Sequence, residues 1–226
     1  PTAGGEISSS QEICSESTPK TLVSKSLPTG YKGTLEYQWQ ASTTSGTEGF
    51  SDIASANAET YSPGKQTATT WYKRLARVSC MADWTGAVES SVVKVTVITV
   101  SQPVVSAGSN IYTYDGTLKT VEINVAQGEI VEWIDFDTFE IIPSLSGTNA
   151  GTYSATAQIK NITYGCYSSN IAVVNLVINK ADVTVTPNAS QSKIYGDDDP
   201  TITYTYTPEL VTNNTLNIHK KIFHNY

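Results

Sequence analysis

The sequence predicts an all-β protein in which β-sandwich domains follow one another in tandem. Tyrosine outnumbers phenylalanine 13 to 4, and strand-favouring Tyr, Thr and Val replace the usual helix formers. Turn residues recur between short alternating segments. A passage built of a closing strand, a tight junction, an opening strand and a Tyr-Asp or Tyr-Gly turn occurs twice, with Tyr114 and Tyr195 in matching positions. Such internal repetition indicates an array of β units joined end to end.

The repeat divides the chain into three predicted domains, at 1–101, 102–181 and 182–226. The third is much shorter than the second, and residues 211–226 carry none of the repeat's landmarks. Half a sandwich leaves strand edges and one apolar face uncovered. We therefore expect the last unit to be incomplete, either by truncation or because another chain completes it. The first residue, Pro1, indicates a processed product or a piece of a longer chain.

The first predicted domain has the strand pattern of an immunoglobulin-like sandwich. Leu35–Gln40 alternates with period two, a longer strand covers Thr69–Val78, and Val92–Val100 closes the domain. A tryptophan in an early-middle strand of such a sandwich normally packs across the core, so Trp39 is predicted to be buried.

Several motifs of this domain carry a resemblance to a known family. They are an initial Ile-Cys, Tyr-x-Trp-Gln, Tyr-Ser-Pro-Gly, Thr-Thr-x-Tyr-x-Arg and a closing Val-x-Val-Thr-Val. Together they resemble the Ig-like repeats of very large secreted surface proteins of Bacteroidetes. The resemblance implies a disulfide between Cys14 and Cys80, both of which follow predicted strands; the residues alone leave two free thiols open.

The second predicted domain resembles the MBG/YDG family of β repeats found in bacterial adhesins. The resemblance is carried by Tyr114–Thr117, Asn149–Tyr153 and Leu176–Ala181. It implies a compact β-sandwich used in tandem and implies no chemistry. Within this domain, residues 129–142 (EIVEWIDFDTFEII) alternate for most of their length and predict one long strand.

The third cysteine, Cys166, lies in a predicted turn and has no predicted partner. Three interpretations stay open: a free thiol, an intermolecular bridge and a reactive nucleophile. A nucleophile needs a nearby base, and both histidines lie in the tail.

Aromatic side chains in loops suggest a ligand site, because aromatic rings stack on sugars. Trp71, Trp84 and Trp133 are the candidates for exposed aromatics, and Trp84 is favoured because it lies in the predicted loop 81–86. Tyr61 is the second loop aromatic considered.

Two acidic groups are candidates for chemistry. Asp135 and Asp137 share one face of the predicted strand at about 7 Å, a spacing that suits a glycosidase pair, although a flat exposed strand lacks a cleft. Asp197, Asp198 and Asp199 suggest Ca²⁺, but three consecutive side chains cannot all converge on one ion, and a turn with Asx hydrogen bonds is favoured. We expect no catalytic residue, no metal and no cofactor.

Charge and composition exclude some classes of binding partner. A net charge of −7 argues against nucleic acid and against an anionic membrane surface. No stretch is apolar enough to span a bilayer, and low lysine with high Ser and Thr suits an exported protein.

The sequence therefore predicts a non-catalytic extracellular repeat segment of a bacterial cell-surface adhesin, acting as a stalk or spacer, with neighbouring repeats as its main partners. The alternatives are a carbohydrate-binding module that uses Trp84 and a subunit of a self-assembling filament that polymerises by strand addition.

Overall fold

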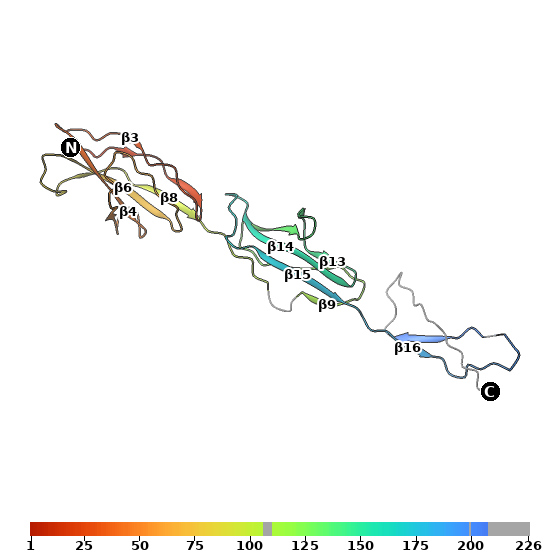
Figure 1. Cartoon of the computed structure of the whole chain (residues 1–226). Helices are drawn as coiled ribbons and strands as arrows, with labels where there is room; N and C mark the ends of the chain where they lie inside the picture. Colours follow the sequence, from red (N-terminus) through yellow and green to blue (C-terminus); the bar gives the residue numbers. More distant parts are fainter. Residues whose placement is uncertain (106–109, 199, 208–226) are drawn as a thin grey trace. The chain divides into compact units, whose positions relative to one another are not determined.

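A computed structural model describes residues 1–105, 110–198 and 200–207, and every regular element in these ranges is a β-strand (Figure 1). No helix among the described residues is long and apolar enough to cross a membrane. The residues group into two compact units. Unit 1 comprises Pro1–Pro103, Val125–Val131 and Gln158–Ile171; unit 2 comprises Val104–Asn124, Glu132–Ala157 and Ala172–Tyr226. The predicted boundary at residue 101 lies beside Pro103, whereas the two later stretches of unit 1 fall inside the predicted second domain.

The larger sheet of unit 1 has the strand order β2-β8-β6-β4-β5. β7 pairs with Leu75 and Ala76 of β6, beyond the part of β6 that pairs with β8. β2 runs parallel to β8, and the other neighbours are antiparallel. The strands are β2 (Gln11–Cys14), β4 (Leu35–Ser42), β5 (Ser51–Asp52), β6 (Thr70–Val78), β7 (Val88–Glu89) and β8 (Val93–Ile98).

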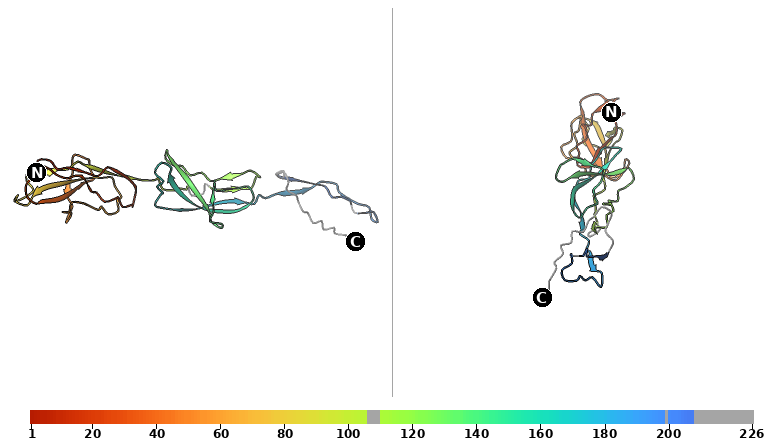
Figure 2. Two further views of the ribbon diagram at one scale, coloured as in Figure 1. Left: turned by 90° about the horizontal axis from the view of Figure 1, so that it is seen from above. Right: turned by 90° about the vertical axis from the view of Figure 1, so that its right-hand side faces the viewer.

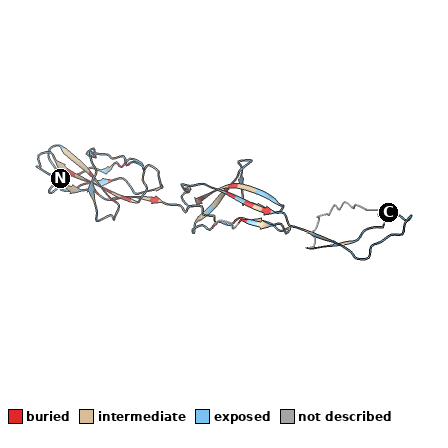
Figure 3. Ribbon diagram, turned by 60° about the horizontal axis from the view of Figure 1, so that its bottom comes forward, coloured by how far each residue is buried: buried red, intermediate tan, exposed pale blue. Residues whose placement is uncertain are grey.

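A second layer covers the inner face of this sheet. It consists of β1 (Glu6–Ile7) paired with β3 (Ser24–Ser26), and an isolated bridge joins Leu22 to Tyr61. The core between the layers is formed by Ile7, Leu22, Trp39, Ala56, Tyr72, Val93 and Val95. Buried residues alternate with half-buried or exposed ones along β6 and β8, as a strand with one inward face requires. Figure 3 colours the ribbon by burial.

This arrangement is an immunoglobulin-like β-sandwich. A first edge strand lies parallel to the last strand, and a fully buried tryptophan, Trp39, stands on the middle strand β4. The predicted fold class is therefore confirmed, as is the core position of Trp39. Its indole Nε1 donates a hydrogen bond to the Ala58 carbonyl oxygen at 2.9 Å.

A second sheet, of five strands, has the order β12-β11-β14-β15-β9. A short two-stranded sheet of β10 with β13 accompanies it. The inward residues on β14 and β15 include Ala155, Ala157, Val174 and Leu176. The strands are β9 (Ile111–Thr113), β10 (Lys119–Thr120), β11 (Glu129–Asp135), β12 (Ile141–Ile142), β13 (Ser146–Gly147), β14 (Gly151–Asn161) and β15 (Ala172–Asn179).

The single strand predicted over 129–142 is wrong, because the chain folds back at Asp135. One oxygen of its carboxylate, Oδ1, accepts hydrogen bonds from the N–H groups of Asp137 (3.0 Å) and Thr138 (2.8 Å). Phe139 then adopts a positive φ of 58°, and β12 returns antiparallel to β11. An aspartate that bonds to the next main-chain N–H groups favours a turn over a strand.

The last described elements are β16 (Thr184–Pro187) and β17 (Tyr204–Thr207), which form a two-stranded antiparallel sheet, drawn in blue in Figure 2. Residues 208–226, which contain the tail predicted to lack landmarks, lie outside the described residues, and so does Asp199.

Candidate functional site

The cysteines pair differently from the prediction. Cys14 forms a disulfide with Cys166, with their Cα atoms 5.4 Å apart, and Cys80 is free and exposed. The pairing of Cys14 with Cys80 is therefore wrong. Because β2 is parallel to β8 and β6 is antiparallel to it, the carboxyl ends of β2 and β6 lie at opposite ends of the sheet. Cys14 ends β2 and Cys80 follows β6, so the two thiols cannot meet.

The disulfide lies in a buried part of unit 1. Cys166 is only 2% exposed, and its carbonyl oxygen accepts a hydrogen bond from the Asn161 N–H at 2.8 Å. The interpretations of Cys166 as a free thiol, an intermolecular bridge or a nucleophile are therefore overturned.

Two further hydrogen bonds join the three sequence stretches that make up unit 1, which are Pro1–Pro103, Val125–Val131 and Gln158–Ile171. The Asn170 N–H donates to Gln102 Oε1 at 3.0 Å, and the Ser101 N–H donates to Glu129 Oε1 at 3.0 Å. Burial acts to raise the pKa of Glu129, but the hydrogen bonds from Ser101 and Ala126 hold the pKa below its ordinary value. The carboxylate of Glu129 is thus an ionised acceptor that ties the 125–131 stretch to the end of the first one.

The aromatic candidates separate into core and surface residues. Trp133 is only 4% exposed, so its prediction as an exposed aromatic is wrong. Tyr61 is not a loop platform either, because its ring packs between Trp39 (centroids 5.7 Å apart) and Tyr72 (5.9 Å). Trp71 is half-buried on the outer face of β6, where the ammonium of Lys94 lies 5.5 Å from its ring centroid.

Trp84 is half-buried in the loop after β6. It belongs to a chain of contacts, called the Trp84 stack below, that runs from Trp84 through Arg77 to Glu36. The Arg77 guanidinium lies 4.5 Å from the centroid of its ring, and Arg77 Nη2 forms an ion pair with Glu36 Oε2 at 2.8 Å. Glu36 and Arg77 face each other across β4 and β6. The sequence analysis missed this pair, although opposite charges on two adjacent predicted strands were a usable signal.

A hollow of about 410 Å³ lies beside this stack. It is lined by Leu35, Glu36, Tyr37, Gln38, Asn57, Arg77 and Trp84. This hollow, called the Trp84 hollow below, combines an aromatic ring with charged and amide side chains and is the candidate ligand site.

The acidic candidates do not form a reactive centre. The Asp135 carboxylate is used in the turn described above, where it accepts the main-chain N–H of Asp137, its predicted partner. Hydrogen bonds from Thr138 and Asp137 lower the pKa of Asp135, so it stays an ionised acceptor. Within the described ranges, no group of three His, Cys, Asp or Glu side chains could hold a metal ion.

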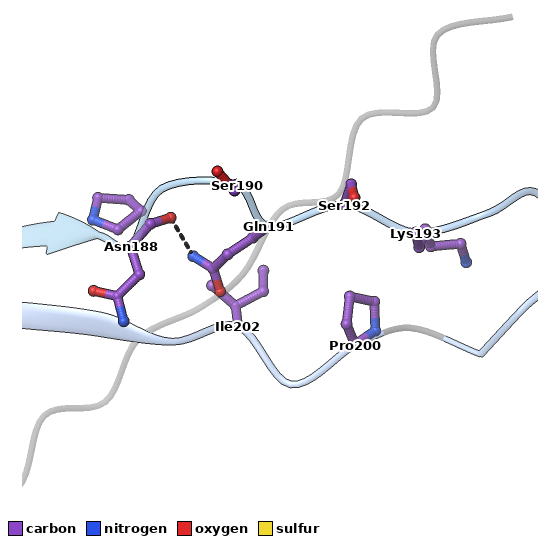
Figure 4. A pocket seen from close by; sticks show the side chains of 8 residues that line it. Asn188, Ser190, Gln191, Ser192, Lys193, Pro200 and Ile202 are labelled. Carbon is purple, nitrogen blue, oxygen red and sulfur yellow. Dashed lines mark hydrogen bonds between the residues drawn. The ribbon is translucent and has the colours of Figure 1, made fainter.

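A second hollow, of about 470 Å³, lies in the connection between β16 and β17, between the segment that leaves β16 and the segment that enters β17 (Figure 4). Gln191 spans it: its Nε2 donates to the carbonyl oxygens of Asn188 (2.9 Å) and Thr203 (2.7 Å), and its Oε1 accepts the Thr203 N–H. The amide thus takes the place of a ladder hydrogen-bond pair between the segments. The remaining lining consists of Pro187, Pro200 and Ile202 together with Ser190, Ser192 and Lys193.

Comparison with family models gives a match over the first part of the chain. Residues 3–99 match a family model described as a domain of unknown function (DUF8696). Comparison with curated proteins gave no match.

Among solved structures, the crystal structure of the N-terminal four Ig domains of Dscam1 isoform 6.44 is similar to this chain at 11% identity and a TM-score of 0.28. The match covers 91% of this chain and 59% of that one, so the chain spans less than two thirds of its length. A likeness of this size carries no argument, and the fold assignment stands on the strand order.

Proposed function

We propose that the chain is a non-catalytic extracellular spacer, a segment of a bacterial cell-surface adhesin whose β-sandwich repeats separate a binding region from the surface. The observation that carries the proposal is the Cys14–Cys166 disulfide, which closes a sequence separation of 152 residues inside a two-layer β fold. Disulfides persist in oxidising compartments, so the bridge fits an exported protein. Its partners are then neighbouring repeat units.

The position of the bridge suits a chain that bears tension. Force applied to the two ends passes through Cys14 and Cys166 and bypasses the residues between them, because a covalent bond joins the two sulfur atoms. The Asp135 carboxylate, one of the two that would suggest chemistry, acts as a turn acceptor instead. Both features favour a structural role over a catalytic one.

Single-molecule force spectroscopy on the full chain, held at its two ends, tests this proposal. In the oxidised protein, unfolding should release none of the length between the cysteines; after reduction the extension should grow by about 550 Å, from a separation of 152 residues at about 3.6 Å each. A spacer should also resist extension until a distinct unfolding event. An oxidised chain that stretches smoothly, like an unfolded polypeptide, would show that it does not bear load.

A second candidate function is self-assembly by strand addition, which β16 and β17 favour. Among the described residues these two strands pair only with each other, and Tyr195 and Ile194 between them are 95% and 76% exposed. A two-stranded sheet is marginally stable alone and gains from added strands. Light scattering of the full chain and of a variant lacking residues 182–226 distinguishes the candidates: loss of polymers on deletion supports assembly, and monomers in both support the spacer.

A further inference from the structure

The Trp84 hollow lies against a strand edge that the sheet leaves open. β4 pairs with β6 along its whole length, whereas β5 meets only Gln40 and Ala41 on the other side. On that other edge the Trp39 N–H donates to the Ala56 oxygen, and the Trp39 oxygen accepts the Ile53 N–H, both at 2.9 Å. Main-chain groups of an antiparallel strand point to alternate edges, so Tyr37 presents its N–H and C=O to the same edge as Trp39. No backbone partner for Tyr37 lies on this edge among the described residues.

The side chains around this edge are rich in planar polar groups. Four of the seven lining residues, Glu36, Gln38, Asn57 and Arg77, end in a carboxylate, amide or guanidinium. The volume of about 410 Å³ lies within the range of small-molecule sites, roughly 300 to 1,000 Å³. The hollow therefore offers many hydrogen-bonding atoms beside the half-buried ring of Trp84.

Several of these groups are held in place without a ligand. Gln38 Nε2 donates to the carbonyl oxygens of Trp39 (2.9 Å) and Ile53 (2.8 Å), which leaves the amide oxygen as its remaining acceptor. The Tyr37 ring packs on the buried Arg74 guanidinium, 4.3 Å from the ring centroid. A site formed in advance loses little side-chain entropy on binding.

The charges in the hollow select the class of ligand. The ion pair between Glu36 and Arg77 leaves no net charge at its centre, which favours a neutral ligand. A pyranose ring fits this chemistry, because its hydroxyls both donate and accept hydrogen bonds while its C–H face packs on an aromatic ring. An extended peptide fits less well, because strand addition draws its specificity from a series of pockets for alternate side chains, whereas this edge offers one hollow with a mostly polar lining.

We propose that the Trp84 hollow binds a neutral saccharide, with a pyranose ring stacked on Trp84 and its hydroxyls bonded by Glu36, Arg77, Asn57 and the Tyr37 main chain. The site is independent of the spacer function. Force resistance without saccharide binding refutes this site alone, and saccharide binding by a chain that bears no load refutes the spacer alone.

The test is calorimetric titration of the full chain with cellohexaose, xylohexaose, mannohexaose and chitohexaose, and with an anionic oligogalacturonate for comparison. We expect saturable binding of at least one neutral hexasaccharide. Trp84→Ala should weaken it about tenfold or more, equivalent to about 1.4 kcal/mol. Asn57→Ala, at an exposed position, should weaken it severalfold without affecting folding, and Trp71→Phe, on the same sheet but outside the hollow, should leave it unchanged.

Three results would overturn the proposal. The first is that no neutral hexasaccharide binds, although circular dichroism shows that the chain is folded. The second is binding that both Trp84→Ala and Asn57→Ala leave intact. The third is a preference for oligogalacturonate, or a shift of the Tyr37 amide NMR signal by an extended Val/Thr-rich peptide but by no saccharide.

Discussion

At the scale of single residues, Arg74 is the most unusual feature of the first sandwich. Its side chain is fully buried on the inward face of β6, and its Nη1 donates to Ser24 Oγ on the opposite layer at 2.8 Å and to the Glu59 carbonyl oxygen. Many Ig domains join their two layers by a disulfide that packs against the core tryptophan. Here a hydrogen bond joins the layers beside Trp39, whose ring centroid lies 5.6 Å from the guanidinium.

Arg74 stabilises the core less than its contacts suggest. Its Nε and Nη2 have no hydrogen-bond partner among the described residues, and burial lowers its pKa. A buried charge with unpaired donors is often replaced by an apolar side chain of similar size without loss. We expect Arg74→Met to leave the free energy of unfolding unchanged or raised, and Arg74→Ala to lower it by about 3 kcal/mol through the cavity it leaves.

Urea denaturation of both variants measures this difference. Equal destabilisation by Arg74→Met and Arg74→Ala would contradict the argument, because it would show that the guanidinium itself holds the layers together. Lys25→Met, at an exposed position of β3, controls for the loss of one positive charge.

At the scale of elements, the β11–β12 hairpin shows how one side chain ends a strand. The alternation in residues 129–142 continues through the turn, so periodicity alone extends the strand past its end. The signal that ends it is Asp135 followed by Thr138, whose N–H and hydroxyl both donate to the same carboxylate oxygen.

Acid should loosen this hairpin. The pKa of Asp135 is lowered in the fold by the hydrogen bonds from Thr138 and Asp137, so the ionised carboxylate binds the turn more tightly than the protonated one. Its stabilising effect is therefore fully present above the ordinary pKa of 3.8 and is lost as the pH falls through the lowered value. NMR should show the Asp135 carboxyl titrating below its ordinary pKa of 3.8, with the hydrogen-exchange protection factors of the Asp137 and Thr138 amides falling as it does.

Asp135→Asn is the matched variant, because the amide oxygen keeps an acceptor but loses the charge. The protection factors of these amides should be severalfold lower than in the wild type at neutral pH and should change little on acidification. Identical exchange in the wild type and the variant at every pH would show that the turn does not depend on the carboxylate.

The sequence was most informative where a pattern belongs to one strand. The alternation in β4, β6 and β8 and the burial of Trp39 were predictable, because each depends on one face of a single strand. The disulfide was not, because pairing depends on strand direction: β2 runs parallel to β8, which separates Cys14 from Cys80. The Trp84 hollow was predictable only in part. Its tryptophan lies in a recognisable loop, but Arg77 and Asn57 reach it from other segments.

At the scale of the whole molecule, the Cys14–Cys166 disulfide is the covalent link between distant parts of the sequence. It joins the first stretch of unit 1 to the third, across a sequence separation of 152 residues. In the loop-entropy account, closing so long a segment contributes at most about 5 kcal/mol. The resemblance implied a bridge from Cys14 to Cys80, which would close a shorter loop within the first predicted domain. The observed bridge instead joins cysteines from the first and second predicted domains.

The three cysteines provide their own control for this argument. We expect Cys14→Ser and Cys166→Ser to lower the thermal midpoint of the oxidised protein equally, and the double variant to match either single one, since each removes the same bond. Cys80→Ser should leave the midpoint unchanged, because that thiol is free and exposed. Thiol labelling of the folded wild type should modify one cysteine per chain, Cys80. If labelling instead modified Cys166, or if Cys80→Ser lowered the midpoint as much as Cys14→Ser, the bridge between Cys14 and Cys166 would not be the one that stabilises the protein.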